Sequence, residues 1–344
     1  MRLYIDKANL ISFLDSRRDV EHMDIYADCE RMIRRQLTVH YNFPKAQCND
    51  DAKLQAWFLN ATNGCGYNES PDVFANTEDV IYPPRPLKGT FYNQASREQL
   101  SSVYLIDANV NAVRETHTVL IGGLGEEIST LKRLFCKTDY DFSCKYPLLG
   151  KNSFRCWEQL NSDGHILPTT DIIIGDRYIF GGEKDIEDSL LVQNLYSILR
   201  LFGAKKGSKI NLVIFSIGKR DRTLWELRIN HIRKCLFHKQ GSINVTLVFY
   251  AKDTNGKYSH IPHDRFLITN YRLFTSGDSF CYFNSNNENI SNGSFLQVDS
   301  LVKYENLIIV DSMLEWLQQL YNSIKRINND MLIIGDKKSS LLQM

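Results

Sequence analysis

The sequence predicts an α/β fold with a largely parallel sheet for the second half of the chain, and a separate mixed α+β domain for the first half. From residue 171 onward, short apolar runs alternate with longer segments whose apolar residues recur every three or four positions. Such alternation of strand-like and helix-like patterns is typical of an α/β domain. At 344 residues, the chain is long for one hydrophobic core and sufficient for two domains.

The composition is that of an ordinary globular protein, with 43% hydrophobic and 24% charged residues. A formal net charge of +1 means that any nucleic-acid or membrane partner must be bound by a local patch. No stretch approaches the roughly 18 apolar residues that span a bilayer, and Asp6 and Lys7 interrupt any signal-peptide pattern. The eight cysteines form no C-x-x-C pair, which favours free buried thiols over zinc or disulfides. We therefore expect a cytoplasmic protein without a membrane, metal or cofactor.

The first domain is expected to cover residues 1–150, with a long irregular loop at 61–98 that is rich in Asn, Gly, Pro and Ser. A glycine turn at 122–125 precedes a predicted helix, and it has two interpretations: packing glycines, or a phosphate loop. Predicted strands lie at 2–5, 103–107 and 116–121, and predicted helices at 25–39, 51–60 and 126–136.

Asp6 and Asn9 follow the first predicted strand, and they leave two interpretations open. They can form a turn and a helix cap, as these residue types often do. The same Asp-x-x-Asn spacing also resembles the opening of nucleases of the NYN type, which bind metal through acidic residues.

The second domain is expected at residues 165–328, followed by a C-terminal tail at 329–344. A boundary region at 138–168 contains one short packed helix around Trp157 and Leu160. Ser312 and Glu315 form a capping box that predicts the start of the last helix. The predicted strands are 171–180, 209–217, 243–250 and 307–310, and the predicted helices are 185–202, 223–237 and 312–327. The residues expected to be buried in the sheet are Leu212, Ile214, Val245, Leu247 and Ile309.

A hairpin predicted at residues 263–283 contains the best candidate site. His263 and Arg265 are two residues apart, so they lie on one side of an extended strand. Asn270 follows at the end of that strand, and a second strand leads into a turn with Ser276 and Ser279. An imidazole, a guanidinium and a carboxamide can all donate hydrogen bonds to an oxyanion. We therefore expect these side chains to converge on a concave, phosphate-binding surface.

The hairpin resembles the signature of the phospholipase D superfamily, His-x-Lys followed after four residues by Asp and then by a Gly-Ser-rich turn. His263, Arg265 and Asn270 occupy the matching positions, and the resemblance covers roughly residues 169–328. It implies a mixed sheet flanked by helices, with His263 as the nucleophile on phosphorus and Arg265 as the phosphate ligand. Active members of this superfamily bring two such motifs together, whereas this chain has one recognisable copy.

Two positions depart from that signature. Arg265 keeps the positive charge, and a guanidinium binds phosphate well. Asn270 replaces a carboxylate, and a neutral amide cannot stabilise a protonated imidazole; the comparable change in a serine-protease triad lowers turnover by about 10⁴ in a known case. Asp278 in the following turn is the candidate replacement. We thus expect phosphate binding with weakened or lost catalysis.

A second candidate surface is the basic stretch around the helix predicted at 223–237. With an aromatic residue and histidines interleaved, it predicts contacts to a nucleic-acid backbone; the alternative is a solvated helix face. The candidate contacts are Arg220, Arg222, Arg228, Arg233 and Lys234.

Together these patterns predict a phosphate- or nucleic-acid-binding component of a cytoplasmic complex, with a protein partner or a second copy of itself. Two alternatives remain. The chain can be an active phosphodiesterase or nuclease in which two copies of His263 meet across a dimer. It can also be a purely structural interaction protein, in which the hairpin serves only the fold.

Overall fold

The structure is a computed structural model. It describes residues 2–5, 7–16, 38–41, 51–63, 100, 102–105, 120–122, 143–150, 153–167, 169–182, 186–203, 207, 209–218, 221–236, 241–252, 264–327 and 329–344. The chain divides into two compact units. Unit 1 comprises Met1–Phe142 with Ser300–Leu307, and unit 2 comprises Ser143–Asp299 with Ile308–Met344.

The described part of unit 1 is built on four parallel strands. Two helices, α1 (Lys7–Ser16) and α3 (Ala52–Asn63), pack together through Phe13 and Trp57, whose rings meet edge to face at 6.2 Å. The sequence predicted a mixed α+β domain, whereas these strands are all parallel. In spatial order they are β2 (Thr38–Tyr41), β1 (Arg2–Ile5), β3 (Ser102–Leu105) and β4 (Leu120–Gly122).

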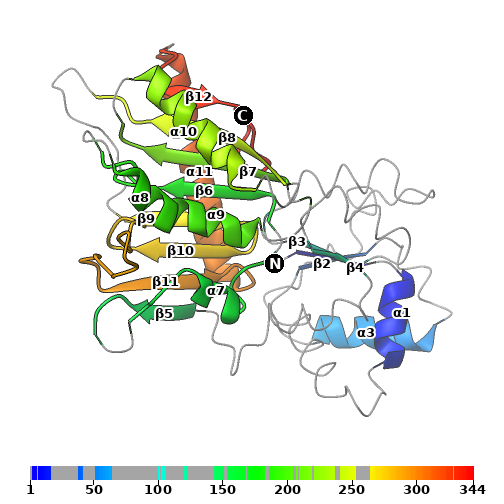
Figure 1. The fold of residues 1–344 in the computed structure, drawn as a ribbon. Helices are drawn as coiled ribbons and strands as arrows, with labels where there is room; N and C mark the ends of the chain where they lie inside the picture. The colour runs from blue at the N-terminus through cyan, green and yellow to red at the C-terminus, as the bar shows by residue number, and fades with distance from the viewer. Residues whose placement is uncertain are drawn as a thin grey trace. The chain divides into compact units, whose positions relative to one another are not determined.

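Unit 2 is built on an eight-stranded mixed sheet (Figure 1). Three neighbouring strands, β6, β7 and β8, are parallel, while β9 runs antiparallel to β6 and β12 runs antiparallel to β8. The α/β class predicted for this half of the chain is confirmed, but the expectation of a largely parallel sheet is wrong, because antiparallel pairs lie on both sides of the three parallel strands. In spatial order the strands are β12 (Ile333–Gly335), β8 (Ser242–Phe249), β7 (Lys209–Ser216), β6 (Asp171–Gly175), β9 (Arg265–Thr269), β10 (Arg272–Ser276), β11 (Phe295–Ser300) and β5 (Ser143–Pro147).

Helices cover both faces of this sheet, with α8, α9 and α10 on one face and α11 on the other (Figure 1). Because both faces are covered, the central strands are apolar along almost their whole length. Leu212, Ile214, Val245 and Leu247 are buried, as the sequence predicted. The helices are α7 (Glu158–Ser162), α8 (Asp188–Leu191), a π-helical turn at Val192–Tyr196, α9 (Ser197–Phe202), α10 (Arg222–Lys234) and α11 (Tyr304–Arg326).

The predicted strand at 307–310 is wrong, because these residues belong to α11. Leu307 and Val310 are buried and Ile309 is 50% exposed, which is a helical period rather than a strand in a sheet. A short β-branched apolar run fits either a buried strand or a helix, so its pattern alone does not distinguish the two. Ser312 and Glu315 consequently lie inside the helix and do not cap it.

Three strands at the margins of the sheet were not predicted from the sequence, namely β5, β11 and β12. The expected tail at 329–344 contains β12, which pairs with β8 through Ile333 and Val248. Gly335 ends β12 with a φ of +108°, and a Cβ there would lie 2.0 Å from the carbonyl oxygen of Val245. This part of the chain is therefore packed against the sheet.

Other sequence predictions met mixed outcomes. The predicted strand at 171–180 ends at Gly175, and Asn9 lies inside α1 rather than in a turn. The short helix near Leu160 is confirmed as α7. Of the four cysteines that the structure describes, all are free, yet Cys156 is exposed. The predicted helix at 25–39 is wrong at its end, where β2 begins at Thr38, and the predicted loop at 61–98 is wrong at its start, because α3 continues to Asn63. The other residues of these two elements, the predicted helix at 126–136 and the glycines at 123–125 lie outside the described residues.

None of the helices in the described ranges is long and apolar enough to cross a membrane.

Candidate functional site

The candidate site lies at the carboxyl ends of β6, β7 and β8. Asp176 directly follows β6, Ser216 ends β7 and Tyr250 follows β8. Arg265 begins β9, and its cross-strand partner Ser276 ends β10. Because β7 and β9 flank β6 on opposite sides, this edge is a position where open α/β sheets commonly bind ligands.

Asp176 organises this edge from a buried position. Its carboxylate accepts hydrogen bonds from the Ser279 hydroxyl at 2.7 Å and from the backbone N–H groups of Phe280 at 2.8 Å and Tyr178 at 2.9 Å. Burial raises the pKa of Asp176, although these hydrogen bonds and the charge of Arg265 act in the opposite direction. The carboxylate thus ties the turn after β6 to the turn after β10.

Arg265 is buried beside the same two turns. Its Nη1 donates to the carbonyl oxygen of Gly277 at 2.8 Å, and its charge opposes the effect of burial on the pKa of both Asp176 and Asp278. Its guanidinium carbon lies 5.7 Å from the centre of the Tyr178 ring. The charge of Arg265 is therefore partly balanced by two carboxylates.

Tyr178 and Arg177 form the accessible part of the site. The Tyr178 side chain is large, aromatic and 43% exposed. The guanidinium carbon of Arg177 lies 4.7 Å from the centre of that ring. No acceptor in the described part of the chain receives a hydrogen bond from the Arg177 guanidinium, and its Nε is enclosed without a partner. An exposed ring with a cation beside it is suited to stacking a base and binding a phosphate.

The two serines predicted to bind phosphate are already engaged within the protein. Ser279 donates its hydroxyl to Asp176, and the Ser276 hydroxyl accepts from the backbone N–H of Asp278 at 3.1 Å. Asp278 also accepts from Asn292 N–H at 2.8 Å and from Ser291 Oγ at 3.0 Å. Burial raises the pKa of Asp278, but the hydrogen bonds and Arg265 outweigh burial and lower it overall. A negative Asp278 disfavours a phosphate directly at this turn.

The prediction that Asn270 converges with Arg265 is wrong. Asn270 follows the far end of β9, about 16 Å from Arg265 at roughly 3.3 Å per residue. Its side chain is fully buried, accepting from the N–H groups of Thr170 at 2.8 Å and Asp171 at 3.3 Å and donating to Thr170 Oγ1 at 2.9 Å. Asn270 thus fixes the β9–β10 turn to the start of β6. His263 lies outside the described residues.

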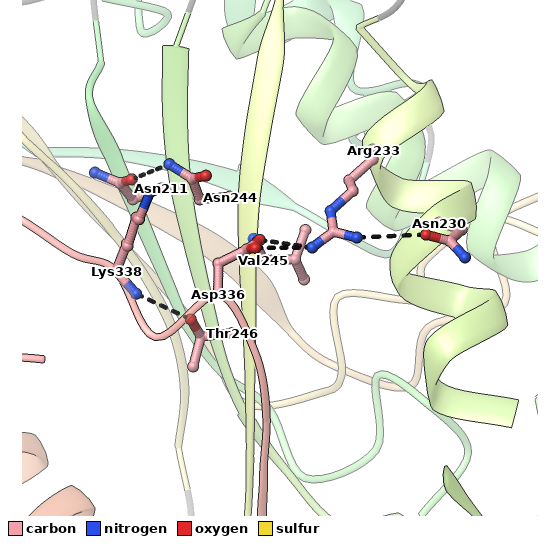
Figure 2. A network of polar contacts seen from close by, with 8 residues as sticks. All are labelled: Asn211, Asn230, Arg233, Asn244, Val245, Thr246, Asp336 and Lys338. Atoms are coloured by element: carbon pink, nitrogen blue, oxygen red, sulfur yellow. Dashed lines mark hydrogen bonds and ion pairs between the residues drawn. The ribbon is translucent and has the colours of Figure 1, made fainter. Parts of the chain in front are cut away.

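The basic stretch is largely paired within the protein. Arg222 pairs with Glu226 on the same helix, and Arg228 is buried, donating to Asp188 and to the carbonyl oxygen of Ile186. Arg233 pairs with Asp336 (Figure 2). Lys234 is exposed, and Arg220 lies outside the described residues. Three of the five predicted nucleic-acid contacts are therefore held by carboxylates of this chain.

A shallow depression of about 400 Å³ lies beside α10, lined by residues that include Leu224, Leu227, Arg228 and His231. It shares no residue with the edge at Asp176. Within the described ranges, no group of three or more His, Cys, Asp or Glu side chains is arranged to hold a metal ion. Neither feature extends the candidate site.

The sequence pointed to Arg265 and the serine turn but not to Asp176, Arg177 and Tyr178. The predicted strand at 171–180 had included all three, although Gly175 followed by a charged pair is a usable signal for a strand end. Gly175 is needed there, because a Cβ would lie 2.1 Å from the Phe266 ring. The sequence matches no known family model, and no curated protein matches it.

Proposed function

We propose that unit 2 binds single-stranded nucleic acid at the edge formed by Arg177, Tyr178 and Arg265. The observation on which the proposal depends is the exposed Tyr178 ring, with two guanidinium groups within 4.7 and 5.7 Å of its centre. This proposal keeps the phosphate-binding role expected from the sequence and moves it from the serines to Arg177.

Tyr178 supplies a surface on which a base can stack. Stacking on an aromatic side chain is worth about 1–3 kcal/mol per base and tolerates any sequence, because every base has a π-face. A base inside a duplex is already stacked, so this contact favours single strands. The hydrogen bond from Tyr178 N–H to the buried Asp176 fixes the backbone that holds the ring.

Arg177 supplies the phosphate contact, because it alone of the two arginines has no carboxylate partner among the described residues. Arg265 contributes positive charge 5.7 Å from the centre of the ring, and Gly277 O and the nearby Asp176 and Asp278 hold it in place. A bound strand would thus be contacted by one aromatic face and one available cation.

Binding rather than cleavage is the role we propose for this edge. Asn270 serves the β9–β10 turn, and Ser279 directs its hydroxyl proton to Asp176. The resemblance to the phospholipase D superfamily stays a proposal, as does the alternative in which His263 residues of two copies cleave a phosphodiester. Loss of cleavage in His263→Ala, with binding retained, would favour that alternative.

Unit 1 suggests a second candidate function, a metal-dependent nuclease. Its parallel sheet has β1 between β2 and β3, and the sequence continues with Asp6 after β1 and with Asp107 two residues after β3. Carboxyl ends of neighbouring parallel strands meet at one edge of a sheet, where ligands commonly bind. Asp6→Asn should abolish Mg²⁺-dependent cleavage of a single strand, whereas Asp15→Asn on the exposed part of α1 should not.

The binding proposal is tested with a fluorescently labelled oligothymidine and anisotropy across a series of salt concentrations. Tyr178→Ala should weaken binding about 5- to 150-fold, which corresponds to 1–3 kcal/mol, while Tyr178→Phe keeps the ring and serves as the matched control. Arg177→Ala should weaken binding and reduce the slope of log affinity against log salt by about 0.7.

Failure of the protein to bind the oligonucleotide would refute the proposal. So would a Tyr178→Ala variant that binds as tightly as the unaltered protein. Lys234→Ala distinguishes the edge at Tyr178 from the basic face of α10. A large loss of oligonucleotide affinity in this variant, without one in Arg177→Ala, would place the binding site on α10.

A further inference from the structure

Arg272, the first residue of β10, is a buried cation that pairs with no carboxylate among the residues that the structure describes. Only 5% of the residue is exposed, and its Nε is enclosed without a hydrogen bond. In the part of the chain that the structure describes, no carboxylate, carbonyl or hydroxyl group accepts from its guanidinium. Burial lowers the pKa of Arg272 to about 10, so the group stays protonated at neutral pH.

The backbone of Arg272 is held firmly. Its N–H donates to Thr269 Oγ1 at 3.1 Å, and Thr269 Oγ1 lies 3.4 Å from the Arg272 carbonyl oxygen. Asn270, within the same tight turn, is bonded to the start of β6 at Thr170. The arginine therefore cannot reach another partner through a shift of the turn without breaking these hydrogen bonds.

Among the described residues, the neighbour that affects the pKa of Arg272 is an aromatic side chain rather than an acid. Tyr146 on β5 is this neighbour, and its hydroxyl donates to Asp163 at 2.6 Å. That carboxylate is thus engaged by the tyrosine. The Tyr146 ring packs against Phe154 at 5.3 Å and edge to face against His165 at 5.8 Å.

We propose that Arg272 is the receptor for a small oxyanion, either a carboxylate or a phosphate, bound beside the Tyr146 ring. A buried charge without a partner is costly, and an anion from outside would remove that cost. The planar guanidinium fork matches two oxygens of either group. Arg272 and Arg265 lie at opposite ends of the β9–β10 hairpin, so this site is separate from the proposed nucleic-acid surface and does not rest on it.

The test is thermal unfolding of the full chain in rising concentrations of sodium phosphate or sodium acetate, with ionic strength held constant by chloride. An anion that binds only the folded state raises the melting temperature progressively. We expect this rise in the unaltered protein and in Arg177→Ala. Arg272→Met, which keeps the length without the charge, should lose the rise and should melt no lower than the unaltered protein without anion.

Arg272→Lys is the second variant, and it keeps the proposal testable if the methionine variant does not fold. Lysine keeps the charge but loses the fork, so we expect a smaller rise that needs more anion. The proposal is overturned if neither anion raises the melting temperature of the unaltered protein, or if Arg272→Met or Arg272→Lys responds as strongly as the unaltered protein. A response that disappears in Arg177→Ala alone would assign the anion to the nucleic-acid surface instead.

Discussion

The guanidinium of Arg233 on α10 donates from Nη2 to both carboxylate oxygens of Asp336, at 2.8 and 2.9 Å (Figure 2). Asp336 also accepts from the backbone N–H of Val245 on β8 at 2.7 Å. One carboxylate therefore joins a helix, a central strand and the segment after β12. Arg233, which the sequence predicted to bind nucleic acid, therefore stabilises the fold.

Removal of the Asp336 carboxylate should destabilise unit 2. Asp336→Ala leaves the Val245 N–H without its acceptor, and we expect a loss of about 1–3 kcal/mol in the free energy of unfolding. Asp336→Asn keeps an acceptor oxygen and should lose less. Urea unfolding of the two variants checks this expectation, and equal stability of Asp336→Ala and the unaltered protein would contradict it.

The same pair predicts a dependence of stability on pH. Burial raises the pKa of Asp336, but the hydrogen bonds from Arg233 and Val245 outweigh burial and lower the pKa overall. The pKa of Asp336 is lower in the folded than in the unfolded state. The ionised carboxylate therefore stabilises the fold above the unfolded-state pKa of about 3.9, and this stabilisation is lost as the pH falls through the folded-state pKa. Urea midpoints of Asp336→Asn and the unaltered protein should therefore converge in acid. A difference in urea midpoint between the two proteins that stays constant down to acid pH would exclude this linkage.

Leu247 and Ile309 form a matched pair for testing the core. Leu247 is fully buried in β8, and its change to alanine should cost about 2–5 kcal/mol through lost transfer free energy and a cavity. Ile309 is half exposed on α11, so its change to alanine should cost much less. Equal losses in urea unfolding would show that the assigned burial of these two residues is wrong.

Asn270→Asp should not create a phosphodiesterase, because the residue lies at the opposite end of β9 from Arg265. Asn270→Ala should instead lower the free energy of unfolding by about 1–3 kcal/mol, because two backbone N–H groups lose their acceptor. A cleavage assay on a chromogenic phosphodiester and urea unfolding check the two parts. Cleavage in the aspartate variant alone would restore the catalytic interpretation.

Gly335→Ala should be strongly destabilising. The residue has a φ of +108°, and the new Cβ would meet the Val245 carbonyl oxygen, a backbone atom that cannot turn aside. Gly277 offers the control, because a Cβ there meets nothing within 4 Å. Melting temperatures of the two variants should differ clearly, and similar values would argue against the packing of β12 on β8.

The sequence predicted the centre of the unit 2 sheet well and its margins poorly. Strands such as β7 and β8 are apolar on both faces, so their pattern is distinctive. The run at 307–310 has the same composition, yet its exposed Ile309 belongs to a helix that only the packed structure reveals. In β5 the alternation is short, and Tyr146 is its one buried residue.

The candidate site was predictable only in part, for a related reason. Residue spacing places His263 and Arg265 on one strand face, but it does not show where a strand ends. Asn270 does follow the end of its predicted strand, but its side chain turns to the start of β6 rather than toward Arg265, and Asp176 was hidden within a predicted strand. That no described carboxylate pairs with Arg272 could not be predicted from the sequence, because its neighbour Tyr146 and the partner of that tyrosine, Asp163, are more than a hundred residues away.

The assignment of Ser300–Leu307 to unit 1 makes that unit discontinuous along the chain. A fragment that stops at Phe142 would lack Leu301 and Val302, two fully buried residues of the unit. The complementary fragment would contain these apolar side chains without the rest of their unit. Studies of either proposed activity should therefore begin from the uncut chain.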